Sequence, residues 1–286
     1  MKLIAPAKVN PFLTVGARRP DGLHEIESVM QAVSLFDTVT LTASDAFGVT
    51  VSPAGAAPED DSNLALRAAR VFAELHGGSG VSIAIDKRIP VAAGLGGGSA
   101  DAAATLVGLN GLLETRVSKK ALEKMAAGLG ADVPFCERGG TAAARGVGED
   151  LSALPCPTPV WWVLGISGAR LSTADVYEEF DRLGGGRVED PYDVADALAR
   201  ADVERLASAL RNDLERAALS LAPQIRTGRD ALGAAGALGV ILAGSGPTWL
   251  GLSRDEMHAV AIAAAVQGEF ARVEVVHSVD HGPRPV

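Results

Sequence analysis

Glycine, serine and aspartate stand close together in the stretch PVAAGLGGGSADAAATL, which covers residues 90–106. Glycine lets several backbone N–H groups approach a ligand without side chains in the way. The small and apolar residues 100–113 predict a helix, whose start adds unpaired N–H donors and a partial positive charge. Together these features are typical of a site for an anion, most often phosphate. A tight glycine turn without a ligand is the alternative.

Ser99 and Asp101 lie where the glycine loop passes into this helix. We expect Ser99 to be the N-cap, with a hydroxyl that could also reach a magnesium ion on bound phosphates. Asp101 in the first turn would favour the helix dipole, but beside a polyphosphate its charge is repulsive unless a cation intervenes. The acid therefore indicates Mg²⁺.

Two further segments place polar residues among apolar ones. Lys8 and Asn10 are two apart in APAKVN, so in an extended strand both side chains point to the same face. Asp132 stands before Val133 and Pro134, where a helix is expected to end. A lone lysine is usually solvated and such an aspartate usually caps a turn, so spacing alone leaves their roles open.

Several other chemistries lack their residues. The glycine loop has no lysine after its last glycine, as a Walker A motif requires, and Ser99 replaces the third glycine of a dinucleotide fingerprint. The five histidines show no metal-binding spacing, and no GxSxG elbow is present. The triple glycine at 184–186 has charged flanks and leads into no comparable apolar run, so we expect a solvated loop. Phosphate chemistry remains.

The elements that must position these residues divide the chain in two. Alternation predicts strands over 37–43 and 81–85, and helical spacing predicts helices over 62–78 and 118–130. Three prolines then precede a strand-like apolar run near residue 160, which indicates a boundary near residue 155. We therefore expect domains over residues 1–155 and 156–286, each mixing strands with helices in an α+β fold.

The charge balance limits the partners. The formal net charge of −9 over 286 residues disfavours binding to nucleic acid or to an anionic membrane surface. Cys136 and Cys156 are too few for a disulfide framework and fit a reducing cytosol. Because no segment is long and apolar enough to span a membrane, we expect a cytoplasmic protein. We also expect a monomer or weak homodimer that binds a small molecule.

Taken together, these stretches resemble the GHMP kinase superfamily and, within it, the 4-diphosphocytidyl-2-C-methyl-D-erythritol kinases. The resemblance implies a two-domain fold, similar to ribosomal protein S5 domain 2 in the N-terminal half and ferredoxin-like in the C-terminal half. It also implies that ATP phosphorylates the 2-hydroxyl of 4-diphosphocytidyl-2-C-methyl-D-erythritol in the non-mevalonate isoprenoid pathway. The matching blocks cover residues 5–41, 62–69, 86–106, 129–135 and 242–252.

The same resemblance implies a role for individual residues. Lys8 and Asp132 match the catalytic pair, in which Asp132 accepts the proton of the attacking hydroxyl and Lys8 keeps that carboxylate ionised. The positions that would hold ATP are Asn63 and Lys87 near adenine, together with Pro90, Val91, Ala92, Ala93, Gly94, Leu95, Gly96, Gly97, Gly98, Ser99 and Ala100. The positions that would hold the acceptor are Asn10, His24, Thr173, Tyr177, Gly244, Ser245 and Gly246.

Some of these positions leave alternatives open. His24 would read the cytosine ring and Tyr177 would stack on it, but Leu23 stands where the family usually has a tyrosine. Asn63 and Lys87 could instead be a helix cap and a strand-end charge. Other hypotheses are a GHMP kinase acting on homoserine, a mevalonate-like alcohol or a sugar, an ATP-binding module without chemistry, and a dinucleotide oxidoreductase.

Overall fold

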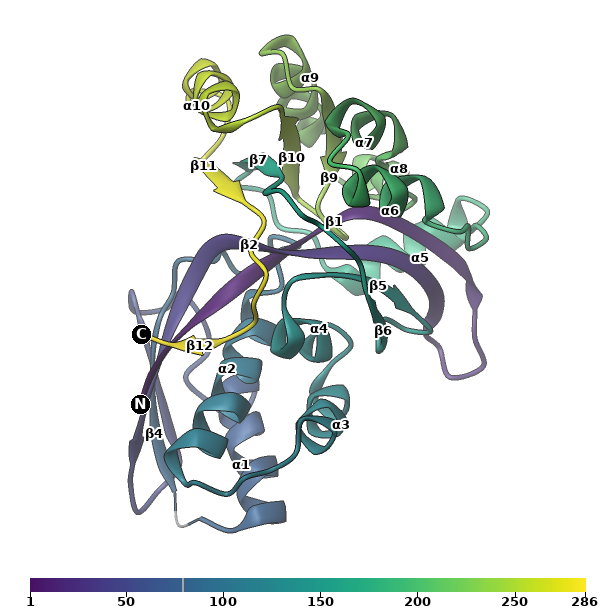
Figure 1. The fold of residues 1–286 in the computed structure, drawn as a ribbon. Coiled ribbons are helices and arrows are strands. Elements are labelled where there is room, and N and C mark those ends of the chain that lie inside the picture. Colours follow the sequence, from purple (N-terminus) through teal and green to yellow (C-terminus); the bar gives the residue numbers. More distant parts are fainter. Residues whose placement is uncertain (79) are drawn as a thin grey trace.

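Two β-sheets and the helices that cover them make up the computed structural model, which describes residues 1–78 and 80–286 (Figure 1). The larger sheet has the order β12-β1-β2-β4-β3, with β5 paired to β2, β6 to β5 and β8 to β1. Its strands are β1 (Lys2–Arg18), β2 (His24–Ala43), β3 (Gly48–Ser52), β4 (Val81–Asp86), β5 (Thr141–Arg145), β6 (Asp150–Ala153), β8 (Arg211–Asn212) and β12 (Arg284–Pro285).

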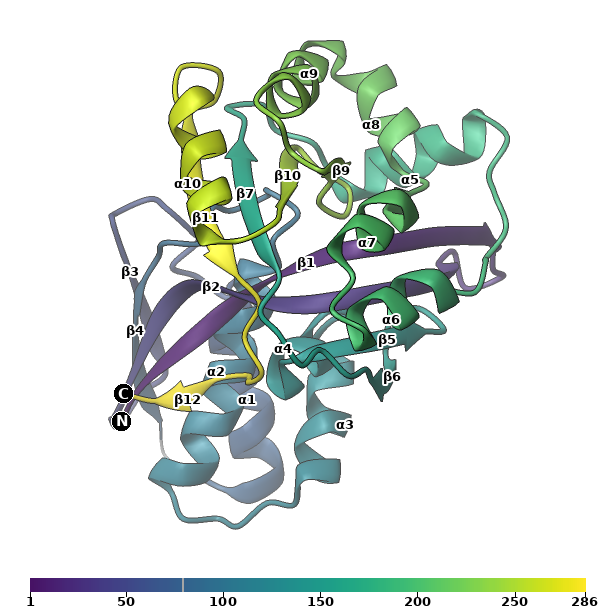
Figure 2. The ribbon, with the colours of Figure 1, turned by 45° about the horizontal axis from the view of Figure 1, so that its top comes forward.

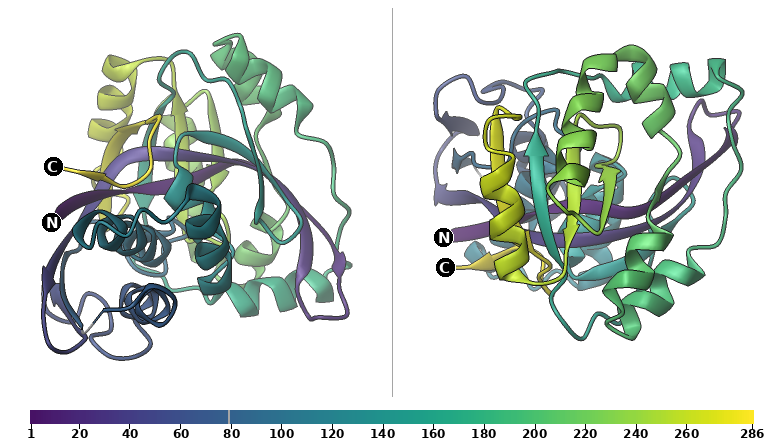
Figure 3. Two further views of the ribbon diagram at one scale, coloured as in Figure 1. Left: turned by 60° about the horizontal axis from the view of Figure 1, so that its bottom comes forward. Right: turned by 90° about the horizontal axis from the view of Figure 1, so that it is seen from above.

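The smaller sheet is antiparallel and has the order β11-β7-β10-β9. Helices α9 and α10 contact its strands, and Figure 3 shows α10 lying along the sheet when the molecule is viewed from above. The strands of this sheet are β7 (Trp161–Ile166), β9 (Gly239–Leu242), β10 (Thr248–Ser253) and β11 (Arg272–His277).

The helices form two groups, which lie on either side of the long β1–β2 ribbon in Figures 1 and 2. Most residues of the ribbon are buried in nearly continuous runs, and its register shifts at bulges keep it paired while it bends. The first group is α1 (Leu64–His76), α2 (Gly97–Leu112), α3 (Lys119–Leu129) and α4 (Val133–Arg138). The second is α5 (Thr173–Arg182), α6 (Tyr192–Ala199), α7 (Val203–Ala209), α8 (Glu215–Leu221), α9 (Arg226–Ala234) and α10 (Glu256–Ala265).

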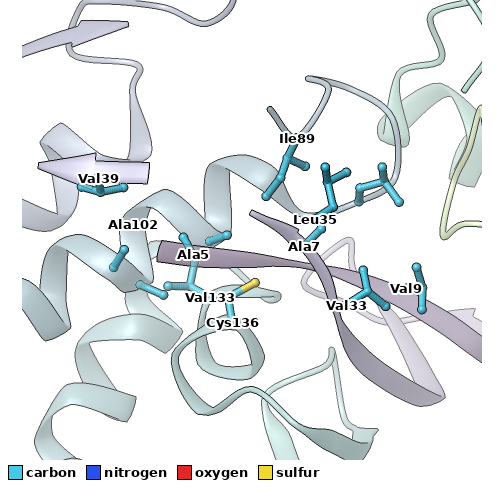
Figure 4. Close-up of a cluster of buried hydrophobic side chains, with 14 of the residues drawn as sticks. Ala5, Ala7, Val9, Val33, Leu35, Val39, Ile89, Ala102, Val133 and Cys136 are labelled. Carbon is cyan, nitrogen blue, oxygen red and sulfur yellow. The ribbon is translucent and has the colours of Figure 1, made fainter. Parts of the chain in front are cut away.

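The core of the first group is built around α2. Figure 4 shows Ala102 of α2 and Val133 and Cys136 of α4 near Ala5 and Ala7 of β1. Small side chains on α2 let the helix approach the sheet closely. An ideal Cβ on Gly108 of α2 would lie only 2.5 Å from a methyl group of Leu41, so the helix and sheet are in full contact. This packing fixes the start of α2, and with it the glycine loop.

Most elements predicted from the sequence are confirmed. Strands 37–43 and 81–85 lie in β2 and β4. Asn63 caps α1 by accepting a hydrogen bond from the Ala65 N–H, and Ser118 caps α3 in the same way. The glycines at 184–186 are exposed, as expected of a solvated loop.

Among the residues that the structure describes, no helix has both the length and the apolar character that crossing a bilayer requires.

One predicted cap is wrong. Helix α2 begins at Gly97, and its N-cap is Gly96 with φ of +70° rather than Ser99. A left-handed backbone at Gly96 turns the chain into the helix without a side-chain cap, and only glycine adopts it at low cost. Ser99 is therefore the third residue of the helix, with a hydroxyl that does not close the helix start.

The division of the chain near residue 155 stays a prediction, and the end of the chain complicates it. After β11 the chain crosses back to the larger sheet, where β12 pairs with β1. We call residues 278–286 the C-terminal strap. Figure 1 shows the two ends of the chain close together as a result.

Candidate active site

A cavity of about 1060 Å³ opens between the two groups of helices. Its wall includes the glycine loop, the β1 residues Lys8 and Asn10, Asp132 before α4, and residues of α5. Almost every residue that the sequence suggested for the site lies on this wall. The exceptions are Ala100, which is fully buried in the core, and Gly246, whose ideal Cβ would meet the side chain of Leu242.

The glycine loop is held in place by backbone contacts. Gly94 has φ of +78°, and an ideal Cβ there would lie 2.1 Å from the carbonyl oxygen of Ala243. At Gly96 an ideal Cβ would lie 2.8 Å from Cγ of Lys8. The Lys8 N–H also donates to the carbonyl of Leu95 at 3.0 Å. A side chain at either glycine would therefore displace the loop from β1 or from the turn after β9.

Lys8 and Asp132 form an ion pair at the junction of the loop, β1 and α4. Lys8 Nζ lies 3.4 Å from Asp132 Oδ2 and donates a 2.8 Å hydrogen bond to Asn10 Oδ1. Asn10 Nδ2 in turn donates to Ser28 Oγ at 2.9 Å. The side chain of Lys8 is 7% exposed, whereas that of Asp132 is 33% exposed and does not cap α4. The lysine is thus fixed from behind while the carboxylate stays open to the cavity.

The opposite wall is made by side chains from both halves of the chain. His24 Nε2 lies 2.8 Å from Asp181 Oδ1, and the His24 ring centroid is 5.0 Å from that of Tyr177. The hydroxyls of Thr173 and Ser245 lie 3.0 Å apart. Burial, with a smaller contribution from the charge of Asp132, raises the pKa of Tyr177 to about 12, so its phenol stays protonated at neutral pH. This wall offers aromatic faces and hydrogen-bonding groups side by side.

A buried charge cluster that the sequence did not reveal supports the floor of the cavity. Lys87 Nζ donates to Asp37 Oδ2 at 2.5 Å and to Asp101 Oδ2 at 2.8 Å. The other oxygen of Asp37 accepts the backbone N–H groups of Arg88 and Ile89, at 2.6 Å and 2.8 Å. Asp37 on β2 therefore fixes the chain just before the glycine loop.

The cluster corrects two expectations. Asp101 is not in the first turn of α2, and it is 3% exposed and paired with Lys87 instead of standing free beside a phosphate. Burial raises the pKa of Asp101 to about 8, against the opposing charge of Lys87. Burial alone would lower the pKa of Lys87, but the charges of Asp101 and Asp37 outweigh it and raise that pKa. Lys87 directly follows β4 and is therefore a charge at a strand end, but it is buried between two carboxylates.

The role of Asn63 and Lys87 at adenine stays a prediction. Asn63 both caps α1 and lies on the cavity wall, where its Nδ2 donates to the carbonyl of Pro58. Lys87 also lies on the wall, although its ammonium is occupied by two carboxylates. Leu23, at the position of the family's usual tyrosine, is 52% exposed on the rim of the cavity.

Family models match both halves of the chain. The GHMP kinases N terminal domain matches residues 63–140, and the GHMP kinases C terminal domain matches residues 194–272. The 4-diphosphocytidyl-2-C-methyl-D-erythritol kinase of Gloeobacter violaceus is 45% identical over 94% of this chain and 91% of its own length. That of Rhodococcus jostii is 46% identical over 92% of this chain and 87% of its own length.

Solved structures give the same picture. A crystal structure of 4-(cytidine 5'-diphospho)-2C-methyl-D-erythritol kinase matches with a TM-score of 0.81 and 36% identity, over 97% of this chain and 99% of that one. A homoserine kinase from Cytophaga hutchinsonii matches with a TM-score of 0.77 at 24% identity, over 100% of this chain and 97% of that one. The second likeness concerns the fold alone.

The two-domain α+β fold and the loop-lined cavity define a GHMP kinase, and the predicted fold class is confirmed. Within that superfamily, the chain belongs to the family of the 4-diphosphocytidyl-2-C-methyl-D-erythritol kinases.

Proposed function

We propose that this kinase transfers the γ-phosphoryl group of ATP to the 2-hydroxyl of 4-diphosphocytidyl-2-C-methyl-D-erythritol, giving the 2-phosphate and ADP. The observation that carries the proposal is that one cavity is lined by the glycine loop, by the Lys8–Asp132 pair and by the His24–Tyr177 pair. A phosphate site, a proton acceptor and an aromatic site thus face a common space. The names of the relatives support the choice of acceptor.

ATP binds with its phosphates against the glycine loop. Residues 94–98 are glycine apart from Leu95, so few side chains cover their backbone N–H groups. The first turn of α2 adds further N–H groups that have no partner within the helix. The positive end of the α2 dipole adds to the attraction for the phosphates. Asn63 and Lys87 lie on the same wall and are the residues proposed to lie near adenine.

The chemical step is an in-line displacement at the γ-phosphorus. A bond forms between the acceptor oxygen and phosphorus while the bond to the β–γ bridging oxygen breaks, and ADP leaves. The hydroxyl proton passes to the carboxylate of Asp132. Because phosphoryl transfer has a loose transition state, this proton can move late, and an ordinary carboxylate suffices as the base. Lys8, held by Asn10, pairs with that carboxylate and orients it.

Mg²⁺ belongs to the proposal as the partner of ATP. Among the residues that the structure describes, no group of three or more His, Cys, Asp or Glu side chains could hold a metal ion. Mg²⁺ that arrives with ATP keeps several waters and needs one or two protein ligands. Ser99 lies on the cavity wall, and its hydroxyl has no hydrogen-bond partner within the described chain, so it fits as such a ligand. The ion would neutralise charge on the phosphates.

His24 and Tyr177 bind the cytosine of the acceptor. Tyr177 offers a ring face for stacking, and Asp181 orients the imidazole of His24 toward the base. Thr173 and Ser245 lie on the same wall and supply hydroxyls for the diphosphate or the methylerythritol. The proposed setting is the cytoplasm, where Cys136 and Cys156 would remain reduced.

The test is a coupled ADP-release assay with several alcohols. We expect kcat/KM for 4-diphosphocytidyl-2-C-methyl-D-erythritol to exceed that for homoserine or mevalonate by about 100-fold or more, because only this acceptor fills the aromatic site. Phosphorus NMR of the product should place the new phosphate on the 2-hydroxyl. The Asp132→Asn variant serves as the control for contaminating ATPase activity. Turnover of a simple alcohol with none of the cytidine compound would contradict the proposal.

A further inference from the structure

The C-terminal strap touches the strand that carries Lys8. In β12, Pro285 faces Leu3 of β1 and Arg284 faces Ile4. The last residue continues this pairing, because the N–H of Val286 donates to the carbonyl of Lys2 at 3.1 Å. The strap is therefore a part of the larger sheet, although it follows the whole C-terminal half of the chain.

The strap also bonds to the position opposite Lys8. Ala32 of β2 is the cross-strand partner of Lys8. Its carbonyl accepts the N–H of Val279 in the strap at 2.8 Å, and its own N–H donates to the carbonyl of Gly140 at 2.8 Å. The residue opposite Lys8 is thus joined through its carbonyl to the strap and through its N–H to the segment that leaves α4.

The closest contact of the strap is with the end of α4. Gly139 ends this helix with φ of +68°, and an ideal Cβ there would lie 2.0 Å from the backbone nitrogen of Gly282. In the reverse direction, an ideal Cβ on Gly282 would lie 2.3 Å from the carbonyl oxygen of Glu137. Two backbones therefore meet with no side chain between them, and this contact requires glycine on both sides.

Helix α4 connects this contact to Asp132. The helix has only six residues, and Asp132 stands at its N-cap. At about 1.5 Å per residue the helix is roughly 9 Å long, too short to bend appreciably. Val133 and Phe135 are fully buried, so the helix is rigidly packed along its length. A displacement at its last turn must move Asp132 as well.

We propose that the C-terminal strap positions Asp132 against Lys8, with Gly282 as the positioning residue. The strap bonds behind Lys8 and presses on the end of α4, so it sets the distance between the two charged groups, 3.4 Å in the structure. The inference rests on the proposed function, because it requires Asp132 to be the base. Misplacing a catalytic group by about 1 Å can cost roughly 100-fold in rate.

The first variant to test is Gly282→Ala in the full-length chain, measured with ATP and the cytidine acceptor. The added methyl group must push α4 away from the strap, so we expect kcat to fall by about 10- to 100-fold. The KM for the cytidine acceptor should stay within about threefold, since the His24–Tyr177 pair does not touch the strap. Gly268→Ala is the matched control, because its ideal Cβ meets no heavy atom within 4 Å and its φ is not positive.

A double-mutant cycle separates positioning from general destabilisation. In an Asp132→Asn background, Gly282→Ala should lower kcat by no more than about twofold, because the group that the strap positions is already disabled. An equal loss in both backgrounds, or a kcat unchanged by Gly282→Ala, would overturn the inference. An inactive wild-type enzyme would instead overturn the proposed function.

A milder variant covers the case in which Gly282→Ala does not fold. The ring of His281 stacks on Phe36 of β2, with centroids 6.1 Å apart and an interplanar angle of 8°. His281→Ala removes this support without forcing a clash, and we expect about a threefold to tenfold loss of kcat with unchanged KM values. A circular dichroism spectrum and melting temperature matching the wild type would show that the loss is not unfolding. If a folded His281→Ala protein had the wild-type kcat, this result would contradict the proposal that the strap positions Asp132.

Discussion

The proposed nucleotide side and the proposed acceptor side of the cavity are built in different ways. The part of the nucleotide side that would face the phosphates is one continuous segment, residues 90–99, held by backbone contacts to β1 and to the turn after β9. The acceptor side collects His24, Thr173, Tyr177 and Ser245 from β2, α5 and the loop after β9. One side therefore presents main chain, and the other presents side chains.

This difference determines which substitutions each side tolerates. On the nucleotide side an added Cβ at Gly94 or Gly96 displaces the loop itself, so even Gly→Ala weakens the site. On the acceptor side the backbone stays in place when one side chain is shortened, and the loss is confined to the contacts of that side chain. Asp132, the proposed base, stands where the two sides meet.

The largest effect should come from Asp132→Asn, which breaks the link between the two sides. The amide keeps the shape of the carboxylate but cannot take the hydroxyl proton, so we expect kcat to fall by about 10²- to 10⁴-fold. Calorimetric titration should find ATP affinity within about threefold of the wild type, since the glycine loop is untouched. Unchanged turnover would remove Asp132 from its role as base.

Gly94→Ala tests the claim that the nucleotide side depends on bare backbone. Its Cβ would lie 2.1 Å from the Ala243 carbonyl, so we expect KM for ATP to rise by about 10- to 100-fold while acceptor binding changes little. Gly185→Ala is the control, because Gly185 also has a positive φ of +61° but no heavy atom within 4 Å of its ideal Cβ. If both variants behaved alike, backbone strain rather than the loop contact would explain the effect.

His24→Ala tests the side-chain character of the acceptor side. Loss of the imidazole should raise KM for the cytidine acceptor by about 10- to 50-fold and leave KM for ATP unchanged. Asp181→Asn, which only weakens the orientation of that ring, should give a smaller rise. Leu23→Ala, at the exposed neighbouring position, should stay within about twofold. A rise in KM for ATP with His24→Ala would show that the two sides are not separate.

The smallest effect concerns the charge cluster below the glycine loop. The pKa of Asp101 rises from 3.8 to about 8 on folding, so between these values the folded chain holds a proton that the unfolded chain has lost. Stability therefore falls as pH rises through this window. Asp101→Asn removes the titration, so the melting temperature of the variant minus that of the wild type should increase from pH 5 to pH 8. A difference that decreases over this range would contradict the raised pKa.

Local patterns predicted the nucleotide side better than the acceptor side. The glycine loop and the caps at Asn63 and Ser118 depend on neighbours in the sequence, and the structure contains them. The prediction that Ser99 is the N-cap of α2 was wrong, because the backbone of Gly96 turns the chain into the helix without a side-chain cap. Residue types alone left Lys8 and Asp132 without a role, and the resemblance to a kinase family paired them.

Other features had no local signal at all. Asp37 looked like the start of an ordinary strand, yet it ties Lys87 and the backbone of Arg88 and Ile89 to β2. The role of the strap could not be predicted either, because the need for glycine at position 282 arises only from its contact with the end of α4. Such contacts between distant segments arise from tertiary packing and could not be predicted from spacing.

The most direct test is a crystal structure with a non-hydrolysable ATP analogue and the cytidine acceptor bound together. The central claim predicts the acceptor 2-hydroxyl about 2.6–3.2 Å from a carboxylate oxygen of Asp132 and about 3–3.5 Å from the γ-phosphorus on the glycine loop. A hydroxyl beyond hydrogen-bond reach of Asp132, with a different side chain beside it, would contradict the claim.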